Sequence, residues 1–345
     1  MTAKLTVFVG EAVFNFSIEK NQESNYQRSF FALLSAAKLT KKNKEVIKIE
    51  QKSNKNSKNP SPFRFPGGKS KLSLFFSLLI EKQNLNNCTY VEPFAGGGGV
   101  ALSLLFDNKV SKIILNDADV AIYSAWRAIL TDTDNFIKLI LNTPVTVEEW
   151  RKQKEIYQHK NQKYSLELGF ATFFLNRTNR SGILNAGVIG GFSQEGKYKI
   201  NSRYNSQALV AKIQKISQKR EQIELFNEDF EHFLAKIQPK IDKNAFFFLD
   251  PPYYQKGKEL YKNYFTDSDH IRLSKILKEL NYPWILTYDN ADFIKILYND
   301  INSKQFSLRY SAANHEKATE LMFFSKNLNF PTENELKNAK IKLFS

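Results

Sequence analysis

A short motif of one acid, two prolines and a tyrosine offers distinctive chemistry. Asp250, Pro251, Pro252 and Tyr253 come directly after the all-apolar run of residues 245–249. The prolines lack a backbone N–H and stiffen the chain, which leaves carbonyl oxygens free to accept hydrogen bonds. Asp250 adds a carboxylate acceptor, and Tyr253 adds a flat aromatic face. Together these groups could stack on a planar ring while acceptors take both N–H bonds of its exocyclic amino group.

Such an arrangement indicates methyl transfer to an amino nitrogen. Holding the two amino hydrogens directs the nitrogen lone pair toward an incoming methyl group, and a sulfonium methyl donor needs no metal. Positioning and electrostatics then account for most of the rate enhancement. A nucleic-acid base could reach the site only by leaving its duplex. The alternative is an ordinary proline turn after a strand.

A glycine-rich loop is a candidate cofactor site. Glu92-Pro-Phe-Ala follows a short β-rich run and precedes four consecutive glycines, Gly96 to Gly99. Glycines directly after a strand let the backbone turn tightly and approach a ligand. Asp117 stands 25 residues after Glu92 and could accept hydrogen bonds from ribose hydroxyls. The spacing fits neither the dinucleotide pattern G-x-G-x-x-G nor a P-loop. A generic glycine turn is the alternative.

Apolar runs and their periods predict the elements that position these residues. Strands are expected at residues 88–92, 113–117, 245–250 and 284–288, and helices at 100–105, at 120–130 and between Leu273 and Leu280. This alternation predicts an α/β fold with a mostly parallel sheet and helices on both faces. Residues 306–310 and 320–325 have no helix between them, so we expect an antiparallel pair at a sheet edge.

The excess positive charge is confined to two parts of the chain. The net charge is +15, of which residues 1–60 contribute +6 and residues 151–225 contribute +9. The second segment has 14 Lys and Arg against 5 Glu and interrupts the strand–helix alternation. We expect it to be an inserted domain that contacts a polyanion. A generally lysine-rich surface is the alternative.

The predicted organisation is a catalytic domain with one insertion. The chain begins with an apolar stretch, for which a helix and a hairpin are the alternatives. It continues into a Lys-, Asn- and Ser-rich segment typical of a linker. The predicted divisions are 1–60 for a tail and flexible linker, 61–150 with 226–327 for the catalytic domain, 151–225 for the insertion and 328–345 for a C-terminal extension.

The composition excludes several other kinds of protein. No run approaches the ~20 apolar residues that span a bilayer, and no signal peptide is recognisable, so no membrane partner and a cytoplasmic location are expected. A single cysteine, Cys88, permits no internal disulfide framework. The histidines His159, His232, His270 and His315 lack ligand spacing, so no metal site is expected.

Six motifs together resemble the Dam-type (alpha-class) DNA adenine-N6 methyltransferases. They are Phe63-Arg-Phe-Pro-Gly-Gly-Lys69, Glu92 to Gly99, Asn116-Asp117, Leu175-Asn-Arg-Thr-Asn-Arg-Ser-Gly-Ile183, Asp229-Phe230 and Asp250 to Tyr253. Their order along the chain agrees with that family over residues 61–327. The resemblance implies a Rossmann-like S-adenosylmethionine-dependent methyltransferase sheet with an inserted, mainly helical target-recognition domain. It also implies site-specific methylation of adenine N6 in a flipped-out base.

The resemblance assigns cofactor roles to individual residues. S-adenosyl-L-methionine would lie against Phe65 and Lys69, with Lys69 a partner for its carboxylate. Asp117 would hold the ribose hydroxyls, and Asp229 with Phe230 would hold the adenine. The methionine part would be wrapped by the glycine loop, namely Glu92, Phe94, Ala95, Gly96 and Gly97, and Asp250 would border the cofactor.

The same resemblance assigns the substrate contacts. Asp250 and Tyr253 would hold and stack the target base, with Pro251 lending its carbonyl and Pro252 stiffening the motif. The expected partner is double-stranded DNA, bound by a monomer in the nucleoid, and a separately acting restriction endonuclease is left open. The expected DNA contacts in the insertion are Arg177, Asn179, Arg180, Lys197, Lys199 and Arg203.

Other functions compete with this interpretation. A cytosine-N4 methyltransferase stays an alternative, because Asp-Pro-Pro-Tyr also serves that amino group, although the order of motifs favours adenine. RNA guanine-N2 methyltransferases carry a similar motif but usually lack a large basic insertion at this place. Cytosine-C5 chemistry needs a cysteine in a Pro-Cys motif, which Cys88 does not provide. A non-catalytic DNA-binding relative is disfavoured by the intact motif and glycine loop.

Overall fold

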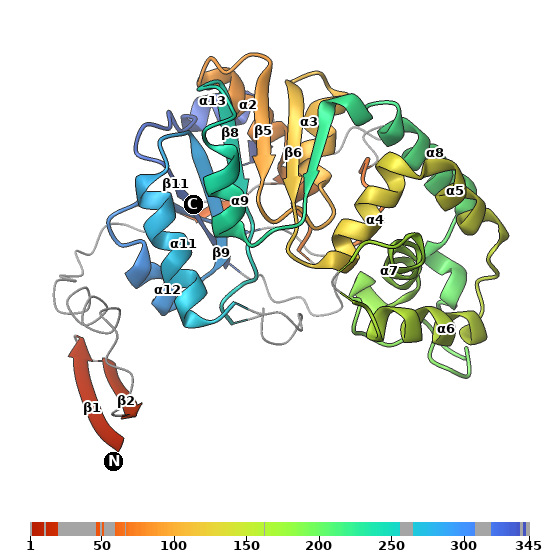
Figure 1. Cartoon of the computed structure of the whole chain (residues 1–345). Coiled ribbons are helices and arrows are strands. Elements are labelled where there is room, and N and C mark those ends of the chain that lie inside the picture. The colour runs from red at the N-terminus through yellow and green to blue at the C-terminus, as the bar shows by residue number, and fades with distance from the viewer. Residues whose placement is uncertain are drawn as a thin grey trace.

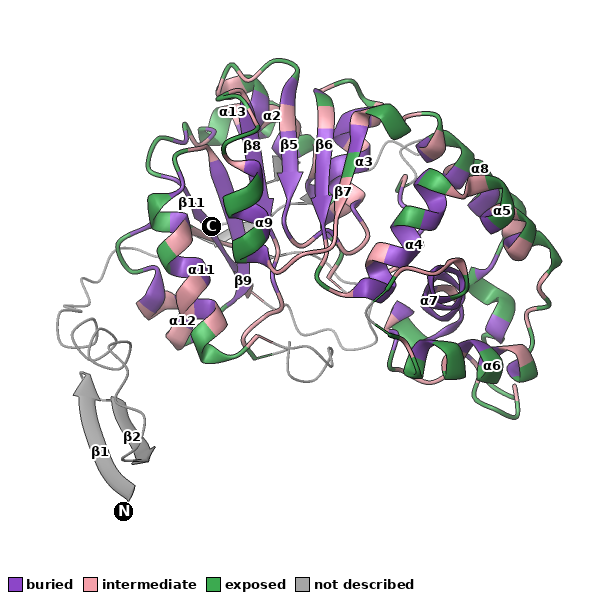
Figure 2. Cartoon of the chain, in the orientation of Figure 1, coloured by how far each residue is buried: buried purple, intermediate pink, exposed green. Residues whose placement is uncertain are grey.

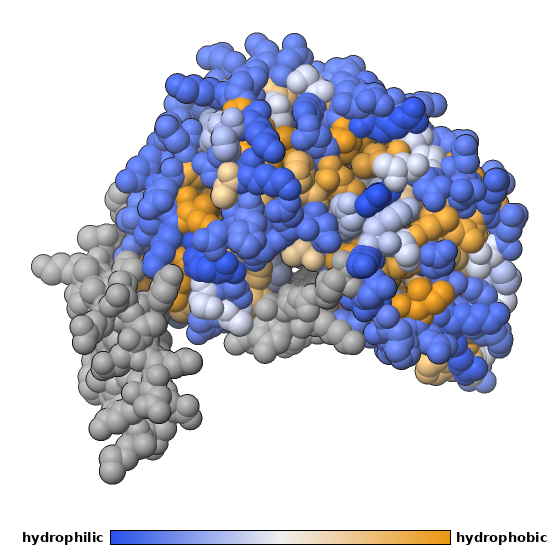
Figure 3. Space-filling model, in the orientation of Figure 1, coloured by the Kyte–Doolittle hydropathy of each residue, from blue (hydrophilic) through white to orange (hydrophobic). Residues whose placement is uncertain are grey.

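The computed structural model describes most of the chain. It describes residues 59–338 except Pro66, Gln162, 256–264 and 308–318, and the backbone of short strands at 2–9, 12–19, 46–48, 50–51 and 341–342. Of the described helices, none is long and apolar enough to cross a membrane. Hydrophilic residues cover most of the face drawn in Figure 3, with hydrophobic residues in patches between them.

An eight-stranded sheet forms the centre of the described chain (Figure 1). The strand order is β3-β10-β11-β9-β8-β5-β6-β7. The neighbours β9, β8, β5, β6 and β7 run parallel, and β11 is antiparallel to both β9 and β10. The bounds are β5 Cys88–Glu92, β6 Val110–Asn116, β7 Ile223–Phe226, β8 Ala245–Leu249, β9 Trp284–Asp289, β10 Asn302–Ser307 and β11 Thr319–Phe324. The predicted α/β fold with a mostly parallel sheet is confirmed.

The amino-terminal region corrects one expectation and decides between two alternatives. Strand β3 (Val46–Lys48) pairs in parallel with β10, so the antiparallel pair of β10 and β11 does not form the edge of the sheet. Within residues 1–60 the structure describes the backbone of four short strands. Strands β1 (Thr2–Val9) and β2 (Ala12–Glu19) form a hairpin, and β4 (Glu50–Gln51) pairs with β12 (Ile341–Lys342). Of the two alternatives for the apolar start, the hairpin is the one observed.

Alternation along the strands separates two hydrophobic cores. In β8, Phe246 and Phe248 join one core, whereas Phe247 and Leu249 join the other. The first face of the sheet is covered by α2 (Ser73–Lys82), α3 (Gly99–Phe106) and α13 (Glu333–Asn338), and the second by α9 (Phe230–Ile237), α11 (Asp267–Glu279) and α12 (Asp292–Leu297). Burial on both faces explains why the central strands read as continuous apolar runs (Figure 2).

A helical unit stands beside the β7 edge of the sheet (Figure 1). It consists of α4 (Val120–Thr131), α5 (Thr133–Asn142), α6 (Val147–Gln158), α7 (Leu166–Thr178) and α8 (Ser206–Ser217), with short 3-10 helices η2 (Arg180–Gly182), η3 (Ile200–Arg203) and η4 (Arg220–Gln222). Helix α7 is its centre and packs against α4, α5 and α6. The division predicted at residue 151 falls within α6, and helices before it already belong to the packed unit.

The close crossing of α4 and α7 depends on a glycine. A Cβ atom added at Gly169 of α7 would lie 2.6 Å from the carbonyl oxygen of Ser124 in α4. Because that neighbour is backbone, a larger side chain could be accommodated only by moving one helix away from the other.

We expect Gly169→Ala to destabilise the protein. Alanine favours an α-helix over glycine by about 1 kcal/mol, but overpacking a buried contact costs about 1–3 kcal/mol, and here the contact is with backbone. Thermal and denaturant unfolding should therefore give a lower stability than that of the wild type. An equal or higher midpoint would mean that the two helices do not depend on this close approach.

Candidate active site

The Asp250–Tyr253 motif lies at the carboxyl end of β8, in the middle of the sheet. Strands β5 and β9 flank β8 in parallel, so their carboxyl ends bring Glu92 and Asp289 to the same edge. In open α/β sheets this edge is the usual ligand-binding edge. The hydroxyl of Thr287 in β9 donates to Asp250 Oδ1 over 2.5 Å and fixes the orientation of the carboxylate.

Lys69 is bound to two carboxylates. Its ammonium lies 3.2 Å from Asp250 Oδ1 and 3.4 Å from Glu320 Oε2, and it donates to the carbonyl of Gly67 over 3.0 Å. Lys69 belongs to the 3-10 helix η1 (Lys69–Leu72), and its side chain is 4% exposed. Its charged partners among the described residues are thus protein carboxylates, and its contact with the cofactor's carboxylate stays a prediction.

Glu320 is a site residue that the sequence analysis missed. It lies in β11, is buried, and accepts a hydrogen bond of 2.5 Å from the Tyr253 hydroxyl. Lys69 also lies 4.9 Å from the centre of the Tyr253 ring. A single acid in the otherwise apolar strand Thr-Glu-Leu-Met-Phe-Phe was the signal that could have found it. We call Lys69, Asp250, Tyr253, Thr287 and Glu320 the catalytic network.

The charges of the network shift its ionisation equilibria. Burial raises the pKa of Asp250; Lys69 and the Thr287 hydroxyl oppose that effect, and the net shift is upward. Burial alone would lower the pKa of Lys69, but the charges of Asp250 and Glu320 outweigh it and raise that pKa above its usual value. Lys69 is therefore protonated at neutral pH, and Asp250 is a stronger proton acceptor than an exposed aspartate.

The chain after Tyr253 is anchored to the next strand. Asp289 at the end of β9 accepts from the backbone N–H groups of Tyr254 and Gln255 over 3.0 and 2.7 Å. Tyr254 also stacks on Phe293, with ring centres 4.7 Å apart. These contacts fix the direction in which the chain leaves the motif.

The glycine loop is held in shape by contacts from three sides. Gly96 donates to Asp117 Oδ2 over 3.0 Å, and its carbonyl accepts from the Trp126 indole over 2.8 Å. Gly98 has φ +55°, and a Cβ there would lie 2.8 Å from Trp126. Glu92 accepts from the backbone of Ala101 over 3.2 Å, so its carboxyl group faces the start of α3. A Cβ at Gly96 would meet no atom within 4 Å, which leaves open space beside the loop.

Two carboxyl groups near this loop have raised pKa values. Burial raises the pKa of Glu92 to about 8, and the charge of Asp250 adds to this effect. Burial and the charge of Asp119 raise the pKa of Asp117 to about 7. The loop residue Ala95 is itself buried and donates to the Asn116 carbonyl over 2.8 Å. The pKa of Asp117 therefore lies close to neutral pH.

The predicted adenine-binding pair stands at the start of α9. Asp229 caps the helix by accepting from the Glu231 backbone over 3.0 Å, and Arg272 lies 3.5 Å from its other oxygen. Phe230 is buried, with the Arg272 guanidinium 4.8 Å above its ring and Phe94 at 5.8 Å. The structure thus brings Phe94 of the glycine loop together with the Asp229-Phe230 pair.

Residues 61–65 connect the glycine loop with the helical unit, and we call them the strap. Ser61 donates to the Gly97 carbonyl over 2.5 Å, and a Cβ at Gly97 would lie 3.2 Å from Phe65. On the other side, Asn176 of α7 bonds both backbone groups of Arg64, over 2.7 and 2.6 Å. The strap therefore touches the cofactor side and the helical unit at once.

The predicted DNA contacts divide into a buried and an exposed group. Asn179 is fully buried; its Oδ1 accepts from the Trp150 indole over 2.6 Å, and its amide donates to the carbonyls of Ile183 and Leu184. Its amide group is thus used within the protein, and its prediction as a DNA contact is corrected to a role in shaping the loop. The exposed members are Arg180, Lys197, Lys199 and Arg203.

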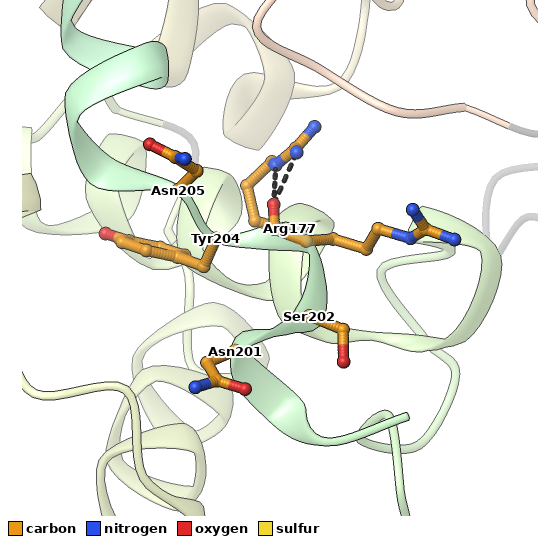
Figure 4. Close-up of a pocket in the computed structure, with 6 residues that line it drawn as sticks. Arg177, Asn201, Ser202, Tyr204 and Asn205 are labelled. Carbon is orange, nitrogen blue, oxygen red and sulfur yellow. Dashed lines mark hydrogen bonds between the residues drawn. The ribbon is translucent and has the colours of Figure 1, made fainter. Parts of the chain in front are cut away.

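Arg177 is partly buried and supports a neighbouring turn. Its guanidinium donates through Nε to the Arg203 carbonyl over 2.7 Å and through Nη1 to the Pro62 carbonyl over 3.3 Å. Figure 4 shows the guanidinium directed at that carbonyl of the turn, which runs between Asn201 and Asn205. Arg177 thus holds η3 and the strap together.

Comparison with known proteins agrees with this geometry. Residues 65–314 match the family described as D12 class N6 adenine-specific DNA methyltransferase. The type II methyltransferase M.MjaIII of Methanocaldococcus jannaschii is 27% identical over 267 residues, which are 71% of this chain and 90% of that protein.

Among solved structures, a candidate RNA methyltransferase of Pyrococcus horikoshii is 10% identical with a TM-score of 0.35, covering 79% of this chain and 90% of its own. TrmN of Thermus thermophilus is 11% identical with a TM-score of 0.32, covering 74% of this chain and 48% of its own. The family match spans both the catalytic motif and the glycine loop, and it selects adenine over the cytosine-N4 and RNA alternatives. The chain belongs to the D12 class of N6 adenine-specific DNA methyltransferases, enzymes that use S-adenosylmethionine as the methyl donor.

Proposed function

We propose that the chain methylates adenine N6 at a specific DNA sequence, with the target base flipped into the space bordered by Asp250 and Tyr253. The observation that carries this proposal is the catalytic network at the carboxyl end of β8. In it, Lys69 and Thr287 fix the Asp250 carboxylate, and Glu320 fixes the Tyr253 hydroxyl. A rigid acceptor beside a rigid aromatic ring suits an amino group on a planar base.

The residues of the glycine loop fit the expected cofactor. Open space beside Gly96 and the carboxylates of Asp117 and Asp229 suit a nucleoside with hydroxyl and amino donors. Phe65 and Phe94 would border the same space. The cofactor, when bound, supplies the methyl group as a sulfonium. Lys69 would act on Asp250, whose carboxylate lies 3.2 Å from its ammonium.

Asp250 is proposed to act in two ways. As a carboxylate it accepts a hydrogen bond from the N6 amino group, with the Pro251 carbonyl as a second acceptor and Pro252 keeping the motif stiff. After methyl transfer the nitrogen must lose a proton, and Asp250, which would already accept a hydrogen bond from that nitrogen, is the proposed base. Its raised pKa makes it a better proton acceptor than an exposed aspartate. Lys69 would keep it ionised until that proton arrives.

Sequence recognition is proposed to reside in the helical unit. The exposed side chains of Arg180, Lys197, Lys199 and Arg203 supply positive charge on the part of the chain that carries net +9. Arginine can contact guanine through two hydrogen bonds, whereas lysine more often contacts phosphate. We expect the protein to act on double-stranded DNA as a monomer, with a separately acting restriction endonuclease left open. Its expected location is cytoplasmic and nucleoid-associated.

Replacing Asp250 tests the central assignment. Asp250→Ala removes the acceptor and the proton-accepting group, so methyl transfer should fall by far more than tenfold, which corresponds to about 1.4 kcal/mol of barrier. Cofactor binding, measured by calorimetry, should persist because the glycine loop is intact. Turnover within tenfold of the wild type would contradict the assignment.

Replacing Glu320 tests whether its charge acts through the network. Gln at this position can still accept from Tyr253 but no longer raises the pKa of Asp250. Since Asp250 must be ionised to act, activity is lost as pH falls through its raised pKa. Glu320→Gln should therefore move this acid limb of the pH–rate profile to lower pH and reduce kcat roughly tenfold.

A matched control for this charge removal is Glu335→Gln, which breaks a partly buried ion pair with Lys82 on the first face of the sheet, outside the catalytic network. Its pH–rate profile should equal that of the wild type. An unshifted acid limb in Glu320→Gln would reduce Glu320 to a packing role.

Arg180 is the proposed base-reading residue. Arg180→Ala should cost about 1–3 kcal/mol in recognition and relax the preference at one position of the site. The measurement is the methylation rate over duplexes that each carry one base change, after sequencing of methylated DNA has given the site. A uniform loss over all duplexes would mean that Arg180 contacts only the backbone.

A further inference from the structure

Three arginines from separate parts of the chain meet where the strap touches the helical unit. Arg64 is fixed through its backbone by Asn176, the neighbour of Arg177 in α7. Arg177 in turn donates to the backbone carbonyl of Arg203. We call Arg64, Arg177 and Arg203 the arginine cluster. Gly182 completes the support, because a Cβ there would lie 2.0 Å from the Arg64 carbonyl oxygen.

The cluster lacks a counter-charge within the described part of the chain. The arginine ion pairs found there belong to Arg220 and Arg272, not to the cluster. Burial together with the positive charges of Arg64 and Arg203 lowers the pKa of Arg177 to about 10. Burial and the charge of Arg203 also lower the pKa of Arg64. Three like charges held together by backbone contacts are unfavourable unless an anion joins them.

One guanidinium atom is both buried and unpaired. Nη1 of Arg64 has no hydrogen-bond partner among the described residues. Leaving a buried donor of a charged group unpaired is costly, and most such groups in folded proteins have a partner. The guanidinium fork matches the geometry of a phosphate or carboxylate, to which it can donate twice. Arg64 was not among the residues expected to contact DNA.

A polar hollow adjoins the cluster. It is lined by Arg177 and by residues 201–205, and its walls carry the side chains of Asn201, Ser202 and Asn205 (Figure 4). Because Arg177 already holds the Arg203 carbonyl, the turn that forms this hollow is fixed before a ligand arrives. Such a site would suit a phosphate diester, which needs several donors and one or more positive charges.

We propose that the arginine cluster binds one backbone phosphate of DNA close to the flipped base. The strap that carries Arg64 also contacts the glycine loop, through Ser61 and Phe65 against Gly97. A phosphate held here therefore has a fixed relation to the cofactor site, unlike phosphates on the exposed lysines. The inference rests on the proposed role of the helical unit in DNA binding and extends it to a single, locatable contact.

The test combines Arg64→Ala with a scan of neutral methylphosphonate linkages. Each duplex carries the recognition site with one linkage near the target adenine made neutral, and affinity is measured in the presence of S-adenosylhomocysteine. Wild type should lose about tenfold in affinity at one or two linkages. The affinity of Arg64→Ala should be about tenfold lower on unmodified DNA, and it should not fall further when those same linkages are neutral.

The controls separate this proposal from its rivals. Arg220→Ala, which removes an exposed arginine paired with Glu221, should bind every duplex as the wild type does. If Arg64→Ala does not fold, Arg64→Lys keeps the charge, loses the fork and should show part of the same pattern.

Two outcomes would overturn the proposal. The first is additivity: if Arg64→Ala and each neutral linkage reduce DNA affinity independently, so that their effects add at every position, Arg64 holds no phosphate. Weaker S-adenosylmethionine binding in calorimetry without DNA would assign the anion to the cofactor's carboxylate. Either result with normal methylation by the wild type leaves the proposed function intact, whereas a wild type that does not methylate DNA refutes the function itself.

Discussion

The buried ammonium of Lys69 is the constraint on which the active site depends. Asp250 directly follows β8, and Glu320 lies in β11; the two carboxylates would repel each other if Lys69 were absent, so one of them would take up a proton. Lys69 comes from a 3-10 helix far away in sequence, and it joins them only when the sheet is complete. Removing one partner from such a buried group is costly. The Asp250–Tyr253 motif is therefore positioned by Lys69 and Glu320, which lie outside it. Within the motif, Tyr253 takes part through its hydrogen bond to Glu320.

Local patterns predicted much of this fold, because burial on both faces leaves uninterrupted apolar strands with glycine or acidic residues at their ends. The cofactor loop and the catalytic motif are contiguous in sequence and were found for that reason. Glu320 and Thr287 were not, since they reach Asp250 and Tyr253 only through the strand order, which places β11 next to β9. Asn179 was misassigned because asparagine among arginines looks like an exposed contact, whereas Trp150 buries it.

The molecule separates its charge between two regions and joins them through a short segment. The sheet holds its buried ammonium between two carboxylates at Lys69, while residues 151–225 carry a large positive excess. The strap lies between them, with Ser61 bonded to the glycine loop and Arg64 bonded to α7. The glycine loop and the helical unit are thus joined by one piece of backbone. A shift of the strap would disturb both the glycine loop and α7, because the strap is hydrogen-bonded to each of them.

The balance of charge within the catalytic network also suits the reaction. Lys69, Asp250 and Glu320 together carry one excess negative charge when all three are ionised; Lys69 and Glu320 are buried, and Asp250 is partly exposed. Such a charge stabilises a positive charge nearby far more than it would in solvent. In the proposed reaction, the methylated amino nitrogen would carry a positive charge beside Asp250 until it loses a proton. Taking that proton would neutralise Asp250 and leave Lys69 balanced by Glu320, without an isolated buried charge.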